Sequence, residues 1–480
     1  MRTLPNLPLP EIPADQVQNA DMLARALRNL IDDGTVAAGQ RLPSTRRWAE
    51  RLGIPRGILV AAFEQLCGEG YLVSVPGRGT QVHPHVRTPA VRCRAPDQSR
   101  GAGALDPGLT SAPDRTRAGR DLEIDLTQDA PEAGALDSPR WRAAWRDAAG
   151  QTPEDLGPGG LGILRTRICA HLERYRQVHR EPDEIVITAG TREGLALLCR
   201  ALWPAGARIG VERPGYPTMR AALRALGCAL TEIPVDAAGV LPPAGGARER
   251  VDALLVTPSH QYPFGGALQR ERRSALLDWA HRTGGVILED DYDAELREAG
   301  APMPALCALD DPVGGGVVTM GTFSKLLSAD VGVGYLVVPR RLLPAVLRVR
   351  EALGVPVPWI AQAALADYLR SGDMQRHLAR LRRRYRRRRE TVAQMFAEVA
   401  GVRVLPMDGG LHSVVEVLGD ERRLLNACVR SGVRVTGLSD YWGEDASGRA
   451  HGLVIGCANP EADAFTEGVR RIRRLVVSGA

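Results

Sequence analysis

A single lysine stands out among the residues that could do covalent chemistry. The chain contains 62 Lys and Arg residues, and all of them except Lys325 are arginine. A codon bias toward arginine would explain the arginines, but it would not explain why one lysine remains. A lysine amine can lose its proton and attack a carbonyl carbon, whereas a guanidinium stays charged and unreactive. The composition therefore favours Lys325 as a Schiff-base lysine, with chance retention as the alternative.

Two further polar residues follow a predicted strand upstream of the lysine. Residues 286–291 read VILEDD, and Tyr292 comes next. Alternation along a strand places Asp290 and Tyr292 on one side and Asp291 on the other. A carboxylate can keep a pyridine nitrogen protonated, and a phenol can hydrogen-bond an oxygen on the same ring. A solvated acidic loop is the alternative interpretation.

A possible phosphate-binding turn and a possible stacking residue complete the set. Residues 187–195, ITAGTREGL, predict a strand, a glycine turn and the start of a helix. Backbone amides at a helix N-terminus can bind a phosphate dianion. Tyr216, within ERPGYPTMR, has a ring that could stack on a flat heterocycle. Each feature is common by itself, but their order beside the one lysine favours a common site.

Alternating apolar and amphipathic segments must position these residues. From about residue 121, apolar runs such as 184–190, 251–258 and 285–291 alternate with longer amphipathic stretches. This alternation predicts a large α/β domain around a mainly parallel sheet. Lys325 follows the predicted strand at 316–320, so it should lie at the rim of the sheet, where α/β proteins bind ligands.

A separate unit is predicted at residues 16–84. Apolar spacing predicts a first helix, then a second helix capped by Ser44 and ending near Gly53, and a third helix starting near Arg56. Two short strands joined by PGRG at 76–79 follow. This order is typical of a winged helix-turn-helix, which reads double-stranded DNA with its third helix. A structural or protein-binding module is the alternative.

Several residues of this unit suit contacts with DNA. The third helix would present Arg56 at its N-terminal end, where recognition helices meet base edges. Arginines on the preceding helix and in the wing would neutralise phosphates. The predicted DNA contacts are Ser44, Thr45, Arg46, Arg47, Arg56, Gly57, Arg78 and Gly79.

The remaining composition bounds the class of protein. Residues 85–120 are rich in Pro, Gly, Ala and Arg and predict a flexible linker. The net charge of +6, with 44% apolar and 25% charged residues, is typical of a soluble protein. We find neither a run near the roughly 20 apolar residues of a membrane span nor a signal peptide. The eight cysteines lack metal-like spacing, so we expect a cytoplasmic protein with reduced thiols and no metal site.

Both parts of the chain resemble known families. Residues 16–84 resemble the GntR family in LPSTR and in EGYL followed by GRGT. Residues 121–480 resemble fold-type I, class I aminotransferases in ERPGYP, TPSHQYPFG, LEDDYDAE, GTFSK and GVGYLVVP. Their combination resembles the MocR-type subfamily of GntR transcription regulators. The resemblance implies a homodimer that binds pyridoxal 5′-phosphate (PLP) in a domain with a large part, about 150–345, and a small part, about 346–480.

The resemblance also implies a role for individual residues. Lys325 would form the aldimine with PLP, Asp290 would pair with its pyridine nitrogen, and Tyr292 would bond its 3-oxygen. The other implied cofactor contacts are stacking by Tyr216, phosphate binding by Gly190, Thr191, Arg192 and Thr322, and positions on the cofactor side for His260 and Gln261.

Four positions depart from the patterns of these families. Relatives usually have an arginine seven residues after the lysine, where this chain has Gly332. Aminotransferases carry a carboxylate-binding arginine near the C-terminus, and Val454 aligns with it. Both losses argue against efficient transamination of ordinary amino acids. In the head, Gly57 and Ile58 stand where GntR proteins commonly have hydroxyl residues, which affects the expected base contacts.

We therefore predict a DNA-binding regulator that senses a small effector at its PLP site. The effector is either PLP itself or an amine whose anionic group is held elsewhere, with Arg220 as a candidate. A working aminotransferase with a fused head is the main alternative, and a scaffold that binds no cofactor is a third. The arginine-rich segment 376–389 is predicted to be a solvated helix face, with DNA contact as the alternative.

Overall fold

The computed structural model describes two compact units. It covers residues 19–75, 79–84, 123–128, 136, 138–243, 250–298, 303–443 and 450–479. The chain divides between Leu105 and Asp106. Arg78 and the predicted linker at 85–120 lie outside the described residues.

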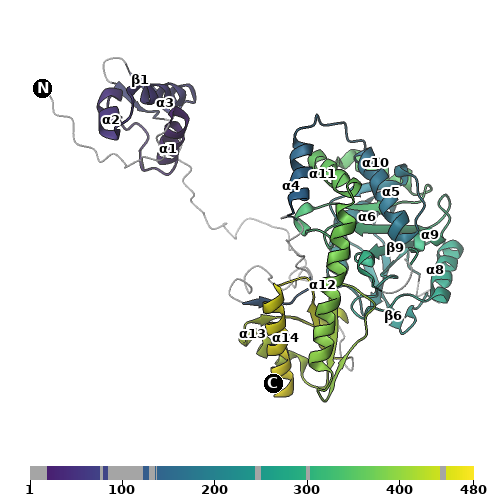
Figure 1. Ribbon diagram of the computed structural model, residues 1–480. Helices are drawn as coiled ribbons and strands as arrows, with labels where there is room; N and C mark the ends of the chain where they lie inside the picture. The colour runs from purple at the N-terminus through teal and green to yellow at the C-terminus, as the bar shows by residue number, and fades with distance from the viewer. Residues whose placement is uncertain are drawn as a thin grey trace, which may run out of the picture. The chain divides into compact units, whose positions relative to one another are not determined.

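The first unit is a winged helix-turn-helix, as the sequence predicts. Its elements are α1 (Ala20–Asp32), α2 (Thr45–Leu52), α3 (Arg56–Gly68), β1 (Leu72–Val75) and β2 (Gly79–Val82) (Figure 1). Ser44 caps α2 by accepting from the amide of Arg47 at 3.4 Å, and Gly53 ends it in a left-handed conformation, φ 64°. The rings of Trp48 and Phe63 meet edge to face at 5.8 Å, so the two helices of the motif share one core.

An eight-stranded mixed sheet organises the second unit. Its central strands run parallel, and the strands at both edges are antiparallel to their neighbours. This confirms the prediction of a mainly parallel sheet. In spatial order the strands are β4 (Ile185–Thr188), β11 (Gly334–Val337), β10 (Val317–Thr322), β9 (Val286–Asp291), β8 (Ala253–Val256), β5 (Arg208–Arg213), β6 (Ala229–Asp236) and β7 (Gly239–Val240).

Helices cover both faces of this sheet. Along β4, Ile185 and Ile187 belong to one apolar core and Val186 to a second, because alternate side chains point to opposite faces. The first core includes residues of α5 (Gly162–Arg176), α8 (Arg270–Thr283), α9 (Leu306–Leu309) and α11 (Trp359–Arg370), against which α4 (Pro139–Ala149) packs. The second includes residues of α6 (Thr191–Leu202), α7 (Pro217–Ala225) and α10 (Leu343–Leu353).

The C-terminal segment forms a smaller α+β part. Its four-stranded antiparallel sheet has the order β12 (Val402–Val404), β13 (His412–Val417), β16 (Gly452–Gly456) and β15 (Thr436–Gly437). A short parallel pair joins β14 (Val433–Arg434) to β3 (Ile124–Asp125). The helices are α13 (Glu421–Arg430) and α14 (Ala462–Val477).

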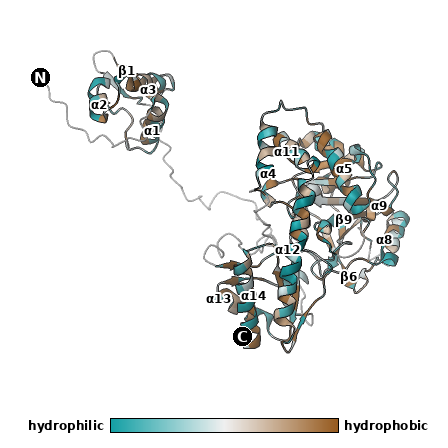
Figure 2. Ribbon diagram, in the orientation of Figure 1, coloured by the Kyte–Doolittle hydropathy of each residue, from teal (hydrophilic) through white to brown (hydrophobic). Residues whose placement is uncertain are grey.

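The long helix α12 (Asp373–Phe396) runs beside α11 at one end and α14 at the other, and it is predominantly hydrophilic (Figures 1 and 2). It carries the arginine-rich segment, and that segment is more than a solvated face. Arg388 is buried and donates to the carbonyl oxygens of Cys457 (2.8 Å) and Pro460. Arg382 donates to the carbonyl of Glu295 at 2.6 Å. Part of the segment therefore fixes α12 to its neighbours.

Among the described residues, no helix is both long and apolar enough to cross a membrane.

Candidate functional site

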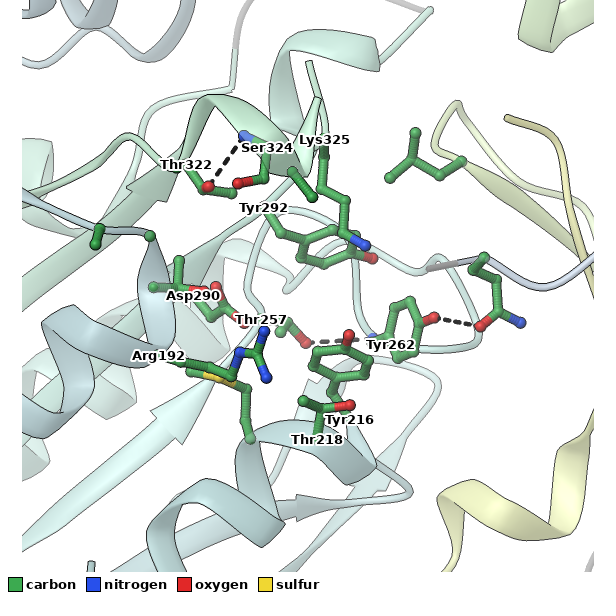
Figure 3. Close-up of a pocket in the computed structure, with 18 residues that line it drawn as sticks. Arg192, Tyr216, Thr218, Thr257, Tyr262, Asp290, Tyr292, Thr322, Ser324 and Lys325 are labelled. Carbon is green, nitrogen blue, oxygen red and sulfur yellow. Dashed lines mark hydrogen bonds between the residues drawn. The ribbon is translucent and has the colours of Figure 1, made fainter. Parts of the chain in front are cut away.

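One pocket of about 330 Å³ collects most of the predicted site residues (Figure 3). It lies where several strands of the large sheet end. Residues of the small part and of the segment that precedes α4 also line it. The predicted residues that line it are Gly190, Thr191, Arg192, Tyr216, Asp290, Tyr292, Thr322 and Lys325. The other lining residues are Gln128, Ala189, Thr218, Met219, Thr257, Tyr262, Ser324, Ala329, Gly332 and Leu411.

A tight turn after β10 presents Lys325. Phe323 is fully buried and anchors the turn, and its carbonyl accepts from the amide of Leu326 at 3.1 Å. The Oγ1 of Thr322 accepts from the amide of Ser324 at 3.1 Å. Because both anchors flank the lysine, its side chain extends into the space bounded by Tyr292, Tyr216 and Asp290 (Figure 3).

Asp290 is the buried carboxylate of this pocket. It stands near the end of β9, paired in register with Met320 of β10. Its Oδ1 is buried and has no hydrogen-bond partner in the described structure. Burial, together with the nearby carboxylates of Asp291, Asp293 and Glu212, raises the pKa of Asp290 to about 7, although Lys325 acts to lower it. This buried carboxylate oxygen without a partner can accept a hydrogen bond from an N–H group of a ligand.

The predicted alternation around Asp290 is confirmed. Asp290 and Tyr292 both line the pocket, whereas Asp291 accepts from Nε of Arg176 at 2.6 Å. Arg176 is 2% exposed and also donates to Oγ of Ser259 at 2.5 Å. Asp291 therefore has a structural partner, and of the two adjacent aspartates only Asp290 faces the pocket.

Tyr292 is held by the segment that contains His260. Its hydroxyl donates to the carbonyl of His260 at 3.0 Å and lies 2.9 Å from Nδ1 of the same residue, which in turn lies 2.9 Å from Asp293. Burial and the surrounding carboxylates raise the pKa of Tyr292 well above its ordinary value, so the phenol stays neutral and keeps its proton. His260 and Gln261 themselves do not line the pocket; Gln261 donates to the carbonyls of Pro214 and Tyr262.

A glycine turn opens α6 beside the pocket. Gly190 has φ 93° and precedes the first helical residue, Thr191. The amides in the first turn of a helix have no acceptor within the helix, and this turn lines the pocket. A Cβ on Gly334 would meet the Cα of Gly190 at 2.8 Å, so the turn packs closely against β11. Together with the Arg192 side chain, the turn can bind an anion.

A neutral hydrogen-bond cluster surrounds Gln128 and reaches the backbone of Val454. Tyr262 and Tyr441 both donate to Oε1 of Gln128, at 2.8 and 2.7 Å. The Nε2 of Gln128 donates to the carbonyl of Val454 at 3.1 Å, and Val454 is fully buried. Sequence reasoning assigned no role to Gln128 or Tyr262. The motif TPSHQYPFG was the available signal for the tyrosine.

Gly332 and Arg220, the other two positions considered for anion binding, lie in different surroundings. Gly332 lines the pocket with φ 59°, and a Cβ there would have no heavy atom within 4 Å. Arg220 does not line this pocket. It is 4% exposed, donates to the carbonyl of Glu212 and lies 3.8 Å from Glu232. Among the described pocket residues, positive charge therefore comes from Lys325 and Arg192.

The head exposes most of the predicted DNA contacts. Arg46, Arg47, Arg56 and Gly57 are exposed on α2 and at the start of α3. Nε of Arg56 donates to Oγ1 of Thr45 at 3.4 Å, which links the two helices of the motif. The side chains of this surface can therefore reach a DNA groove and its phosphates.

Comparisons with known proteins agree with this description. Residues 123–449 match the family described as aminotransferase class I and II, and residues 19–82 match bacterial regulatory proteins of the gntR family. An archaeal alanine:glyoxylate aminotransferase superposes with a TM-score of 0.68 at 23% identity, covering 75% of this chain and 91% of that one. The α-aminoadipate aminotransferase LysN of Thermus thermophilus gives 0.64 at 24%, covering 75% and 93%. The fold is thus that of a fold-type I aminotransferase joined to a GntR-type head.

Curated relatives share both parts. The pyridoxine biosynthesis transcriptional regulator PdxR of Corynebacterium glutamicum is 37% identical over 464 residues, covering 96% of this chain and 97% of that one. The probable rhizopine catabolism regulatory protein MocR of Rhizobium meliloti is 32% identical, covering 94% and 92%. The chain belongs to the MocR-type subfamily of GntR transcription regulators.

Proposed function

We propose that this regulator binds PLP through Lys325 and that occupancy of the pocket controls its binding to DNA. The observation that carries the proposal is the position of the chain's one lysine, in the same pocket as the unpartnered oxygen of Asp290. Relatives support it: LysN was solved with N-(5′-phosphopyridoxyl)-L-leucine, and PdxR is named for pyridoxine biosynthesis.

The side chains of the pocket fit this cofactor. Bound PLP would supply an aldehyde for the lysine amine and an electron-withdrawing ring. Asp290 would accept from the protonated ring nitrogen, and the neutral phenol of Tyr292 would turn its proton from the carbonyl of His260 to donate to the 3-oxygen. Tyr216 lies across the pocket, where its ring can stack (Figure 3). The Gly190–Arg192 turn and Thr322 would bind the phosphate.

The same pocket limits the choice of effector. Beyond Lys325 and Arg192, its described walls hold no cation for the carboxylate of an ordinary amino acid. Losing a charge-assisted pair costs about 1.5–3 kcal/mol, which is roughly 10- to 100-fold in affinity. We therefore expect the signal to be PLP itself, or an amine without a conventional α-carboxylate contact. Arg220 is buried behind the pocket, so it is a poorer candidate than the sequence suggests.

The head would bind double-stranded DNA, and we expect a cytoplasmic homodimer. Twofold symmetry would match two half-sites in an operator, with one recognition helix in each.

Borohydride reduction tests the cofactor assignment. The purified protein should be yellow because of the absorption band of the aldimine. Borohydride should bleach this band and attach the cofactor covalently. Since Lys325 is the only lysine, the other amine able to react is the N-terminus. Peptide mapping should place the label on Lys325, and Lys325→Arg should keep the charge and lose the band. A label on the N-terminal peptide alone would contradict the assignment.

An active aminotransferase with a fused head is the second candidate. The presence of Lys325, Asp290 and Tyr292 in one pocket favours it, whereas Gly332 and Val454 count against it. Turnover with a panel of amino donors and keto acids separates the two candidates. Rapid conversion of the cofactor to pyridoxamine phosphate by an ordinary α-amino acid would favour the enzyme.

A further inference from the structure

A second pocket, of about 420 Å³, lies between α5, the end of α11 and the start of α12. It shares no lining residue with the Lys325 pocket. Cations at Arg167, Arg174, Arg370 and Arg376 line it, and none of its lining residues is acidic. We call it the arginine pocket.

Two of these arginines have no carboxylate partner in the described structure. Arg370 pairs with Asp367, and Arg376 with Asp373 at 2.6 Å. By contrast, the Nε of Arg167 is buried without a hydrogen-bond partner, and the structure gives Arg174 no ion pair. The pocket therefore has a surplus of positive charge.

His171 provides the second, independent observation. It lines the arginine pocket, is 3% exposed, and its Nδ1 has no hydrogen-bond partner. Its Nε2 lies 2.8 Å from Oε1 of Glu295, which orients the ring with a proton on Nε2. Arg167, His171 and Arg174 have helical spacing i, i+4 and i+7, so their side chains share one face of α5. A buried polar atom without a partner in a cationic pocket points to a missing ligand.

The start of α12 forms one wall of the arginine pocket. Gly372 precedes the 24-residue helix and, with Gln375 and Arg376 of its first turn, lines the pocket. The helix dipole favours an anion at such an end, whereas the carboxylate of Asp373 in the same turn, which pairs with Arg376, opposes one. The amide of Gln375 can turn either its oxygen or its nitrogen inward.

We propose that the arginine pocket binds a phosphate group through the guanidinium groups of Arg167 and Arg174, beside the buried Nδ1 of His171. Guanidinium forks match the geometry of phosphate oxygens. The phosphate is either that of a free phosphorylated compound or one of the DNA backbone.

Calorimetry with inorganic phosphate tests the site directly. The full-length protein is first saturated with PLP, so that the phosphate cannot occupy the cofactor pocket. The double variant Arg167→Gln/Arg174→Gln should bind phosphate about tenfold more weakly or worse, since two charge-assisted contacts are lost. The matched control, Arg422→Gln/Arg423→Gln, removes the same charge from exposed positions on α13 and should bind as the wild type does. Arg174→Glu, which leaves Arg167 in place, is the second variant and should weaken phosphate binding at least as much.

A DNA-binding measurement distinguishes the two sources of the phosphate. Affinity for a random-sequence duplex is measured over a range of salt concentrations. If the pocket binds backbone phosphate, the double variant should lower the salt slope by about one to two units relative to the control. If it binds a free compound, DNA binding should match the control while phosphate binding is lost. The proposal is overturned if neither phosphate nor DNA affinity depends on Arg167 and Arg174, or if the control loses as much.

Discussion

Arg176 donates from Nε to Oδ2 of Asp291 across 2.6 Å, next to Asp290 of the Lys325 pocket. Both side chains are buried, so the guanidinium is committed to Asp291 and not to the adjacent Asp290. Asp290 is thereby left as a buried carboxylate with an unpartnered oxygen. This arrangement explains why burial raises its pKa to about 7.

Asp290→Asn should therefore change the pH dependence of stability in the cofactor-free protein. The unfolded chain releases this proton near pH 3.8, whereas the folded chain retains it to about pH 7. Wild-type stability should fall as pH rises through this window, because the folded state binds the extra proton. The variant should lack this fall and gain up to about 4 kcal/mol relative to wild type at pH 8, at about 1.4 kcal/mol per unit. Urea unfolding at pH 4 and pH 8 measures the difference.

The exposed Asp155→Asn provides the control, and it should change stability equally at both pH values. The same variant Asp290→Asn should bind PLP more weakly, because the ring nitrogen loses its carboxylate. A stability difference between Asp290→Asn and wild type that is independent of pH would contradict the raised pKa.

Arg192 and Gly332 line the same pocket, and we predict that Arg192 supplies the phosphate cation that position 332 lacks. Arg192→Gln should weaken PLP binding about 10- to 100-fold through loss of a charge-assisted pair. Pyridoxal, which has no phosphate, should bind to both proteins alike. Absorbance titration of the cofactor-free proteins measures the affinities.

A second substitution tests whether Arg192 takes the role that an arginine at position 332 would have. Adding Gly332→Arg to Arg192→Gln should restore part of the PLP affinity, because a Cβ at 332 meets open space. The recovery should be incomplete, since φ 59° strains an arginine there. If pyridoxal binding falls as much as PLP binding, Arg192 does not act through the phosphate.

Much of the site is predictable from the sequence because its signals are local. Lys325 is identified by counting one residue type, and the sides taken by Asp290, Asp291 and Tyr292 follow from strand alternation alone. The partners of these residues do not follow from the local sequence. Arg176, for example, pairs with Asp291, which lies 115 residues further along the chain.

The missed features depend on distant parts of the chain. Gln128 accepts from Tyr262, 134 residues away, and from Tyr441, 313 residues away, so no local pattern indicates the cluster. Strand β6 was also missed. Near the sheet edge it is mostly exposed or half-buried and lacks the continuous apolar run of its neighbours. The sequence pattern of α12 predicts a solvent-exposed helix face. It cannot show that Arg382 and Arg388 donate to backbone carbonyls, because those carbonyls belong to distant parts of the chain.

In the head, we predict that Arg56 reads a base edge, so Arg56→Ala should weaken binding to a specific duplex by about 1–3 kcal/mol. Arg47→Ala should instead weaken all sequences alike and lower the salt slope by about one unit, as expected of a phosphate contact. Fluorescence anisotropy on a duplex selected from a random library, and on an unselected duplex, measures both effects. Equal losses on the two duplexes for Arg56→Ala would rule out base recognition by that residue.

We propose that occupancy of the Lys325 pocket controls DNA binding. The direct measurement is titration of cofactor-free, full-length protein with PLP while its affinity for the selected duplex is followed, with Lys325→Arg titrated in parallel. We predict that PLP changes the wild-type affinity by about 5- to 150-fold, the usual range of coupling between two sites, with a much smaller change for Lys325→Arg. Identical DNA affinity of the cofactor-free and PLP-loaded wild-type protein, with no amino acid present, would contradict the claim.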